Sequence, residues 1–467
     1  MRAGGEVRLF DVSLVVTSVE KPEVAAIKSI GFSFFNNLVV IFFRLIIATN
    51  LILLGHILYQ EKVHYQLFMT FQIGVFILEF LGKYFIIGLL KYAFFEKKEN
   101  KTMYNTYIRL KTALIFIIPL ITIPISICSY YIMELIFKYS LEIYNQNLIK
   151  EVYKKFLLFT PLIYFFEILF FLNLKFLNAL HRIKTVFIYI IIYLVCHIVL
   201  SWILLFIFNF GVFGLTTSYF LNSFLFFIFT NNKICRIVSG DADDYFHLIP
   251  NGNNLSWDLI NKFGIISYYS MINLGEVFPT QFLFLISLFI DKNQLIVNII
   301  YINFFEVITE IFRGFYYTIK KELSLKNKDI IIRQNYILFF SIYYLIISLT
   351  ILIILILFKN ILLQVYIFKG GEPIFSEIAS NLRIIYPLCV LCMSIKIILN
   401  GIIRGMDIPI SNGRRSFYII VCIVFCYIFC FLYGLGILGI WIGMIILELL
   451  NVGENFSKAI KHFPLVY

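Results

Sequence analysis

Residues 432–444 read LYGLGILGIWIGM, an apolar run interrupted by four glycines, and this run contains the most informative pattern in the chain. A second stretch, residues 208–220, FNFGVFGLTTSYF, repeats part of it. Gly211 recurs as Gly436, at an offset of 225, and the glycine three positions further on recurs at the same offset. Glycine permits both a tight turn and close helix contact in lipid, so each stretch predicts a helical hairpin between two spans. The pair predicts an internal repeat.

The repeat extends ahead of the two glycine stretches. LNALHRIKT begins at Leu177 and LNGIIRGMD begins at Leu399, which aligns Asn178 with Asn400 at an offset of 222. Three extra residues within 407–415 restore the offset of 225. We therefore expect two halves of six spans each.

Composition places the chain in a membrane. Of 467 residues, 61% are hydrophobic and only 14% charged, and the mean hydropathy is +0.91. A chain of this composition has more apolar surface than one soluble core can bury. The predicted fold class is an all-α polytopic membrane protein with about 12 transmembrane helices in two six-helix lobes related by an internal repeat. The expected spans are 31–57, 66–90, 112–137, 156–180, 185–208, 211–231, 259–290, 295–318, 336–358, 383–403, 416–433 and 434–452.

The spans divide the chain into five parts. An even number of spans in each half gives the halves one orientation, related by an axis along the membrane normal, which suits alternating access. The expected parts are a cytoplasmic N-terminal segment 1–30, an N-lobe 31–231 (spans 1–6), a cytoplasmic linker 232–258, a C-lobe 259–452 (spans 7–12) and a cytoplasmic tail 453–467.

The net charge of +12 is interpreted through membrane topology and not as a nucleic-acid site. Basic residues concentrate in the loops 91–111 and 320–333. This bias predicts that both termini are cytoplasmic. The expected location is the plasma membrane or an internal vacuolar membrane. The first 29 residues contain acids and no compact apolar core before a cleavage site, so we expect a cytoplasmic lead-in and no signal peptide.

The seventh span offers the first candidate site. Tyr269, Asn273, Glu276 and Thr280 follow at steps of 4, 3 and 4, which aligns them on one helical face. Pro279 removes a backbone donor there and favours a kink. An ionisable group within a span is costly and indicates function, since a lone carboxylate can hold either a proton or a cation. The alternative is that Glu276 only hydrogen-bonds a neighbouring helix.

The eighth span carries a second polar face. Asn303, Glu306, Glu310, Arg313 and Tyr317 follow at steps of 3, 4, 3 and 4. Arg313 can pair with Glu310 in its own helix, which leaves Glu306 as the acid with no local partner. Two interpretations of this face remain open: it is either an internally neutralised stripe near the cytoplasmic end of the span, or it takes part in transport.

Other charged residues lie in separate spans. Glu79 and Lys83 have helical pair spacing, whereas Glu167 has no partner nearby in sequence. Arg44 and Lys396 are isolated cations. Lys396 either lines a path or snorkels to an interface, and we favour snorkelling. Cysteines inside the spans, including the pair Cys389 and Cys392, lack the His or acid neighbours of a metal site, so no metal or other cofactor is expected.

Several motifs resemble the multidrug and toxic compound extrusion (MATE) transporters, especially the eukaryotic branch. LLGHIL at 53–58 resembles the end of that family's first span. HIVLSWILLFIFNFGVFGLTTSYF from His197 resembles its Asn-x-x-Leu-Ser segment followed by Gly-Val-x-Gly-Ala, with His in place of the Asn. LNGIIRGMDIPISNGRRSFYII and then YGLGILGIWIGM resemble its Gly-Val-Leu-Arg-Gly stretch and its Gly-Leu-Trp-Ile-Gly phrase. Together these matches cover about residues 40–450.

The resemblance implies a cation antiporter of twelve helices in two lobes. Glu276 matches the first acid of the family's Glu-Trp-Trp-x-x-Glu, and Gln281 replaces the second. Asn298 stands in the family's Ala-x-Gln position, and Gly314 matches the glycine of its Pro-x-Gly. The chain departs from the family elsewhere too: the proline of Pro-x-Gly is missing, no acid occurs in 384–403, where relatives have one, and MDIP follows Arg404-Gly405 where a Gly and a Gln are usual. The Gln-Ala-x-Gly signature after the second span is also absent.

The predicted function is secondary active transport, with export of organic cations or other small solutes in exchange for protons, or sodium, as in multidrug and xenobiotic efflux. We expect a monomer whose partners are membrane lipid and a cationic small molecule. The expected substrate- or ion-binding residues are Glu276, Gln281, Asn273, Tyr269, Thr280, Asn298, Glu306 and Glu310.

Two alternatives remain open. One is a lipid-linked oligosaccharide flippase, in which Arg44, Lys83 and Lys396 would face a cationic cavity. The other is a remnant that no longer transports. An enzyme is not expected, because the short outer loops carry no paired carboxylates at catalytic spacing.

Overall fold

The computed structural model describes residues 41–42, 44–53, 100–139, 146–180, 182–238, 278–325, 330–358, 364–366, 373–406, 408 and 412–462. This part of the chain forms helices and contains no β-strand. After a first helix, Arg44–Leu53, the elements are α4 (Asn100–Tyr139), α5 (Gln146–Ala179), α6 (Ile183–Trp202), η2 (Ile203–Ile207), α7 (Gly211–Val238), α9 (Phe278–Ser287), α10 (Lys292–Leu325), α11 (Ile330–Leu357), α13 (Pro373–Asn381), α14 (Ile385–Gly405), α15 (Asn412–Tyr427), η5 (Ile428–Leu432) and α16 (Ile437–His462).

Eight of the described helices are long and apolar enough to cross a membrane. They coincide with eight of the expected spans, and the shorter apolar helices Arg44–Leu53 and Phe417–Leu432 fall on two more. The protein is therefore an all-α, multi-pass integral membrane protein, as the sequence predicts. The expected span 66–90 lies outside the described residues, as does most of 259–290, and α7 continues beyond its expected end to Val238.

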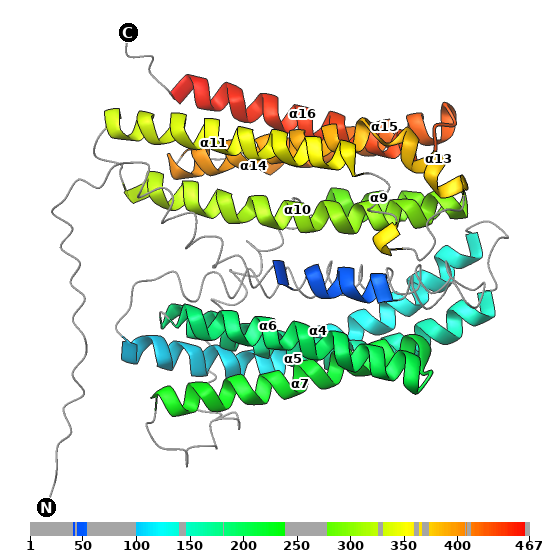
Figure 1. Ribbon diagram of the computed structural model, residues 1–467, viewed down its shortest axis with the longest axis vertical. Coiled ribbons are helices and arrows are strands. Elements are labelled where there is room, and N and C mark those ends of the chain that lie inside the picture. Colours follow the sequence, from blue (N-terminus) through cyan, green and yellow to red (C-terminus); the bar gives the residue numbers. More distant parts are fainter. Residues whose placement is uncertain are drawn as a thin grey trace, which may run out of the picture.

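The described helices form two groups (Figure 1). Helices α4 to α7 pack on one another, and helices α9 to α16 pack on one another, with α10 and α14 in extensive contact. Within its span α10 is 78% buried, whereas α11 is 22% buried. Helix α10 is therefore central to its group, and α11 lies at the outside.

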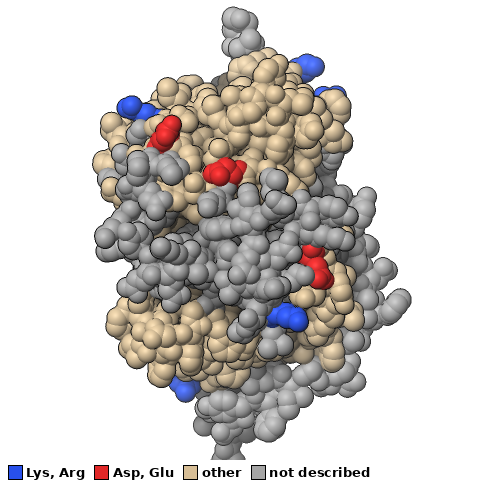
Figure 2. Space-filling model, turned by 90° about the vertical axis from the view of Figure 1, so that its right-hand side faces the viewer, with Lys and Arg blue, Asp and Glu red and all other residues tan. Residues whose placement is uncertain are grey.

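The outer helices expose large apolar side chains. Ile188 and Val195 on α6 are more than half exposed, as are Leu338 and Ile346 on α11. In water such faces would associate, but in a bilayer the lipid tails cover them. Figure 2 shows the end of the molecule on the right-hand side of Figure 1, where few of the described residues on view are charged.

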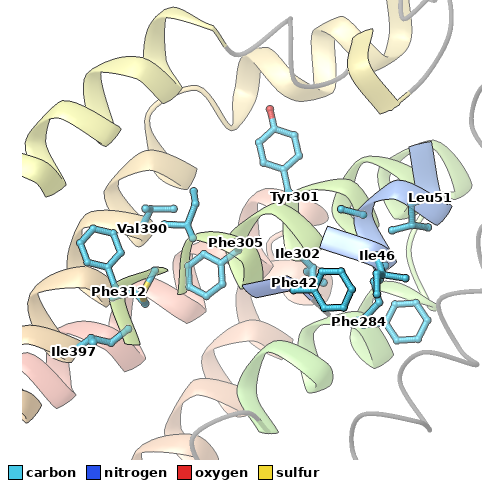
Figure 3. Packing of buried hydrophobic residues seen from close by; sticks show 14 of the residues in the cluster. Phe42, Ile46, Leu51, Phe284, Tyr301, Ile302, Phe305, Phe312, Val390 and Ile397 are labelled. Carbon is cyan, nitrogen blue, oxygen red and sulfur yellow. The ribbon is translucent and has the colours of Figure 1, made fainter. Parts of the chain in front are cut away.

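The first helix, Arg44–Leu53, lies between the two groups (Figure 1). Its Ile46 and the preceding Phe42 point at Phe284 and Ile302 of the second group (Figure 3). The ring of Phe42 also contacts the first group, because it meets the ring of Tyr193 in α6 edge to face, with centroids 5.0 Å apart. We call Arg44–Leu53 the bridging helix because this helix and the nearby Phe42 contact both groups.

The two glycine stretches form the same turn. A short π-helix precedes each turn, η2 from Ile203 and η5 from Ile428, again at the offset of 225. Asn209 has a φ of 53° and its counterpart Gly434 has 66°, while Gly211 and Gly436 have 56° and 54°. The hydrogen bonds repeat too: the distance is 3.1 Å both from Phe210 N to Leu204 O and from Leu435 N to Phe429 O. Repeated glycine spacing therefore corresponds to a repeated backbone.

Candidate functional site

A buried ion pair joins the bridging helix to α10. Arg44 and Glu306, 262 residues apart in sequence, form a salt bridge through Nη1 and Oε2. Their side chains are 5% and 6% exposed. Removing either partner from such a pair leaves a buried charge without compensation, at about 3–5 kcal/mol. The interpretation of Arg44 as an isolated cation is therefore wrong, because its partner comes from a helix far away in the sequence.

The same helix reaches α6 through a second polar contact. His197 Nε2 lies 2.8 Å from Asn50 Oδ1, and both side chains are fully buried. Since Oδ1 accepts, the imidazole carries its proton on Nε2. The other ring nitrogen, Nδ1, and Asn50 Nδ2 have no hydrogen-bond partner among the described residues. His197 is the residue that replaces an Asn of the MATE pattern, so the replacement lies on the contact between the bridging helix and α6.

Helix α10 carries the polar face that the sequence predicts. Glu310 pairs with Arg313 one helical turn further on, which confirms that prediction. Asn303 donates to Ile299 O at 2.8 Å and so bonds within its own helix. Glu306, Glu310 and Asn303 are all buried. Glu306 differs from Glu310 in that its salt bridge reaches outside α10, to the bridging helix.

Asn298 has a structural partner. Trp441 Nε1 of α16 donates to Asn298 Oδ1 at 3.0 Å, and both side chains are fully buried. Asn298 Nδ2 has no hydrogen-bond partner among the described atoms. The tryptophan of the glycine phrase therefore joins α16 to α10.

A third acid lies within the first group of helices. Tyr219 Oη of α7 donates to Glu167 Oε1 of α5 at 2.7 Å, and both residues are buried. The His197 ring lies 5.4 Å from that of Tyr219, which connects this acid to the contact with Asn50. Tyr219 follows Glu167 by 52 residues, so no local spacing indicates the pair.

Lys396 does not snorkel. Its Nζ lies 2.7 Å from Glu448 in α16, and the side chains are 18% and 1% exposed. The expectation fails because Lys396 lies mid-way along α14, about 15 Å from either end at 1.5 Å per residue, which its side chain cannot span. Sequence reasoning did not single out Glu448, although an acid in the middle of an apolar span is a signal for it.

The remaining predicted site residues lie at the start of α9 or before it. Tyr269, Asn273 and Glu276 are outside the described residues. Thr280 and Gln281 lie in α9, and only their backbone is described. Pro279 is the second residue of α9, and the part of the span before α9 is outside the described residues. The kink expected at Pro279 therefore remains a prediction. Glu79 and Lys83 are likewise outside the described part.

Comparison with known proteins identifies the fold. No protein-family model and no curated protein sequence matches the chain. Among solved structures, a eukaryotic MATE transporter, AtDTX14, superposes with a TM-score of 0.71 over 94% of this chain and 96% of that chain, at 15% sequence identity. The chain has the fold of MATE transporters.

Two further solved structures are similar to the chain. A multidrug resistance MATE family transporter of the MOP superfamily, in an inward-facing conformation, has a TM-score of 0.65 at 12% identity and covers 95% of this chain and 98% of that chain. The lipid II flippase MurJ, in an inward closed conformation, also has a TM-score of 0.65, at 15% identity over 95% of this chain and 88% of that one. At these identities the likeness concerns the fold, and activity is argued from the residues.

Proposed function

We propose that the protein is a secondary active transporter that exchanges a small organic cation for protons, or sodium, by alternating access between its two groups of helices. The observation that carries this proposal is the Arg44–Glu306 pair, a buried carboxylate of one group bound to a helix that also contacts the other. The MATE fold supports the proposal because the structures it resembles are described as transporters.

The pair has the energy scale that a conformational switch needs. Moving a two-state equilibrium from 1:99 to 99:1 takes about 5.5 kcal/mol. Breaking a buried ion pair changes the free energy by about 3–5 kcal/mol. A proton or organic cation bound to Glu306 replaces Arg44 as partner of the carboxylate and weakens the contact of the bridging helix with α10. Occupancy of the site is thereby coupled to the arrangement of the lobes.

Exchange follows from competition for negative charge. In the proposed cycle, Glu276, Glu306 and Glu310 supply the carboxylates for which the proton and the organic cation compete. Because one carboxylate cannot carry a proton and pair with a cation at once, loading one ligand releases the other. Tyr269, Asn273, Thr280, Gln281 and Asn298 are proposed to line the same site.

The charges of the described spans favour this function over a flippase for lipid-linked oligosaccharides. That alternative requires cations facing an anionic diphosphate. Arg44 and Lys396, two of the three candidate cations, are instead paired with Glu306 and Glu448. Each carboxylate neutralises the group that an anionic substrate would need, so these two cations are not available for a diphosphate in this arrangement.

The test measures tetraethylammonium uptake into inside-acidic proteoliposomes, with a sodium gradient in a parallel arm. We expect the wild type to accumulate the cation, and Glu306→Gln and Glu276→Gln to lose gradient-driven uptake. Glu306→Gln also leaves Arg44 buried without its counter-charge, so the double variant Arg44→Gln/Glu306→Gln is included to remove both charges and preserve folding.

Glu454→Gln serves as the control, because Glu454 pairs with Lys458 near the end of α16. Wild-type uptake by the double variant would overturn the role of Glu306. If the wild type moved no cation under either gradient but translocated a fluorescent polyprenyl-diphosphate sugar, the antiporter proposal would fail in favour of the flippase.

A further inference from the structure

The tips of the two repeated hairpins expose large apolar side chains at one end of the molecule (Figure 1). We call residues 207–210 and 432–435 the hairpin tips. Phe208 is 56% exposed, and its counterpart at the offset of 225, Tyr433, is 70% exposed. The other apolar residues of the tips, each at least 40% exposed, are Ile207, Phe210, Leu432 and Leu435. Turns that project into water normally carry polar residues, so these tips require another explanation.

The arms of both hairpins are free of charged side chains. The ranges that contain no Asp, Glu, Lys or Arg are 185–232 and 416–447. Phe208 lies 24 residues beyond Lys184, which is about 36 Å of helix at 1.5 Å per residue. Tyr433 lies 19 residues beyond Arg414, which is about 28 Å. A bilayer is about 30 Å thick in its hydrocarbon core and about 40–45 Å with its headgroups, so a hairpin whose charged end lies at one surface ends within the lipid of the opposite leaflet.

A charged turn lies beside the second tip. Asp291, between α9 and α10, is exposed and accepts a hydrogen bond from Asn293 N at 2.9 Å. Gln294 Oε1 accepts one from Ile437 N, also at 2.9 Å, which places the start of α16 beside the start of α10. Gln294 is three residues from Asp291, about 4.5 Å of helix. The charged turn and the apolar tip therefore occur at nearly the same height in the molecule, so height alone does not explain why the tip is apolar.

The backbone of each tip has the partners that contact with lipid requires. Irregular backbone exposed to hydrocarbon is unfavourable, because its polar groups find no water there. In the second tip, Tyr433 N donates to Ile428 O at 3.0 Å, and Leu435 N donates to Phe429 O at 3.1 Å. The equivalent bonds of the first tip run from Phe208 N to Ile203 O at 3.2 Å and from Phe210 N to Leu204 O at 3.1 Å. The π-helix before each turn supplies these acceptors, so these donors need no water.

We propose that the two hairpin tips are lipid anchors, which insert their apolar side chains between phospholipid acyl chains just below the headgroups of one leaflet. The ring of phenylalanine and the ring and hydroxyl of tyrosine suit this depth, where apolar and polar surroundings meet. Phospholipid is the occupant that the lengths of the arms favour, because both tips end within its thickness. Each group of helices thereby has its own anchor, which fixes the depth of that group in the bilayer.

The first experiment measures access of water to the tips. Phe208→Cys, Tyr433→Cys and the control Asp291→Cys are made in the full-length chain, reconstituted in phosphatidylcholine liposomes and treated with a membrane-impermeant sulfonated maleimide. The wild type gives the background of the native cysteines, and denatured samples give total labelling. We expect both tip variants to react about tenfold more slowly than Asp291→Cys, because only the thiolate reacts and apolar surroundings keep a thiol protonated. Equal rates at the three positions overturn the proposal.

A second measurement separates lipid from a second copy of the chain as the cover of the tip. Tyr433→Trp is made together with Trp202→Phe, since Trp202 is half-exposed on α6 and would be quenched itself, whereas Trp441 is fully buried. The vesicles contain phosphatidylcholine brominated on the acyl carbons nearest the headgroup. We expect a larger quenched fraction of fluorescence than in Trp202→Phe alone. Slow labelling without added quenching would mean that protein covers the tip, and overturns the proposal. Neither measurement involves transport, so this inference and the proposed function can fail separately.

Discussion

The α6–α7 hairpin and the α15–α16 hairpin have the same backbone conformation at the turn but different side chains facing each other. Each has a π-helix, a residue of positive φ and a positive-φ glycine, related by the offset of 225. At the same offset, Ser201 faces Ser218 across one hairpin at 2.6 Å, whereas Cys426 packs against Gly443 in the other. The repeat therefore preserves the turn and leaves the facing side chains free to differ.

The difference extends to charge. Glu448, the partner of Lys396, is the counterpart of Ser223 at this offset, and Ser223 bonds to Tyr193 at 2.8 Å. One half thus uses neutral hydroxyls where the other uses a buried ion pair. The shared backbone is therefore compatible with a neutral side chain at this position, and the scaffold by itself requires no charge there.

The greatest destabilisation is expected at the tightest contact of the two turns. A Cβ at Gly439 meets Cys430 N and Phe429 C at 2.6 Å, whereas a Cβ at its counterpart Gly214 meets Leu204 O at 3.1 Å. We expect Gly439→Ala to lower the free energy of unfolding by about 3 kcal/mol and Gly214→Ala by about 1 kcal/mol. At Gly214 a shift of the neighbouring backbone by a few tenths of an ångström makes room for the methyl group, whereas the contact at Gly439 is too short for so small a shift to relieve it.

Thermal unfolding in detergent, followed by size-exclusion chromatography with fluorescence detection, measures both variants. Gly453→Ala in α16 is the control, since nothing lies within 4 Å of its added Cβ. Equal losses at 439 and 214 would show that the two turns are packed alike.

An intermediate effect is expected at the left-handed residue of the turn. Gly434 has a φ of 66° and open space around it, and the equivalent residue in the other half is Asn209. Gly434→Ala should reduce stability by about 1 kcal/mol through backbone strain alone, while Gly434→Asn should be nearly neutral, since asparagine visits this conformation more readily. The ranking of melting temperatures, glycine and asparagine above alanine, is the check. If alanine matched asparagine, backbone strain would not explain the residue choice.

A minor effect is expected from exchanging the facing groups. Cys426 Sγ lies 3.5 Å from Ile440 O. A serine there can donate to that carbonyl, so Cys426→Ser should change stability by less than about 1 kcal/mol. Ser201→Ala, which removes one hydroxyl of the Ser201–Ser218 pair, should lower stability by about 1 kcal/mol, since Ser218 keeps its bond to Leu215 O at 2.8 Å. The same unfolding assay compares them, and a larger loss for Cys426→Ser would mean that the thiol has a role beyond packing.

Sequence reasoning succeeded where the signal is local or periodic. The apolar windows match the described helices, and glycine spacing indicated the repeated turn. The pair Glu310–Arg313 followed from helical spacing. In each case the interacting groups lie within a few residues, or the pattern recurs along one helix.

It failed where a partner comes from another helix. Arg44 is 262 residues from Glu306, and Lys396 and Glu167 are each 52 residues from their partners. Isolated intramembrane charges of opposite sign indicate that pairs exist, because an unpaired charge in lipid is unfavourable. They do not indicate which helix faces which, so Lys396 was assigned to an interface instead of to Glu448.

Hydropathy and glycine placement along the chain were enough to establish the membrane environment, the spans that fall on described helices and the duplicated turn. The reason is that lipid selects apolar spans and glycine allows positive φ. The electrostatics of the interior followed from packing in three dimensions, which placed Arg44 against Glu306 and Lys396 against Glu448. The physical reason is that Coulomb interactions act between neighbours in space, and neighbours in a helical membrane protein are chosen by how the helices pack.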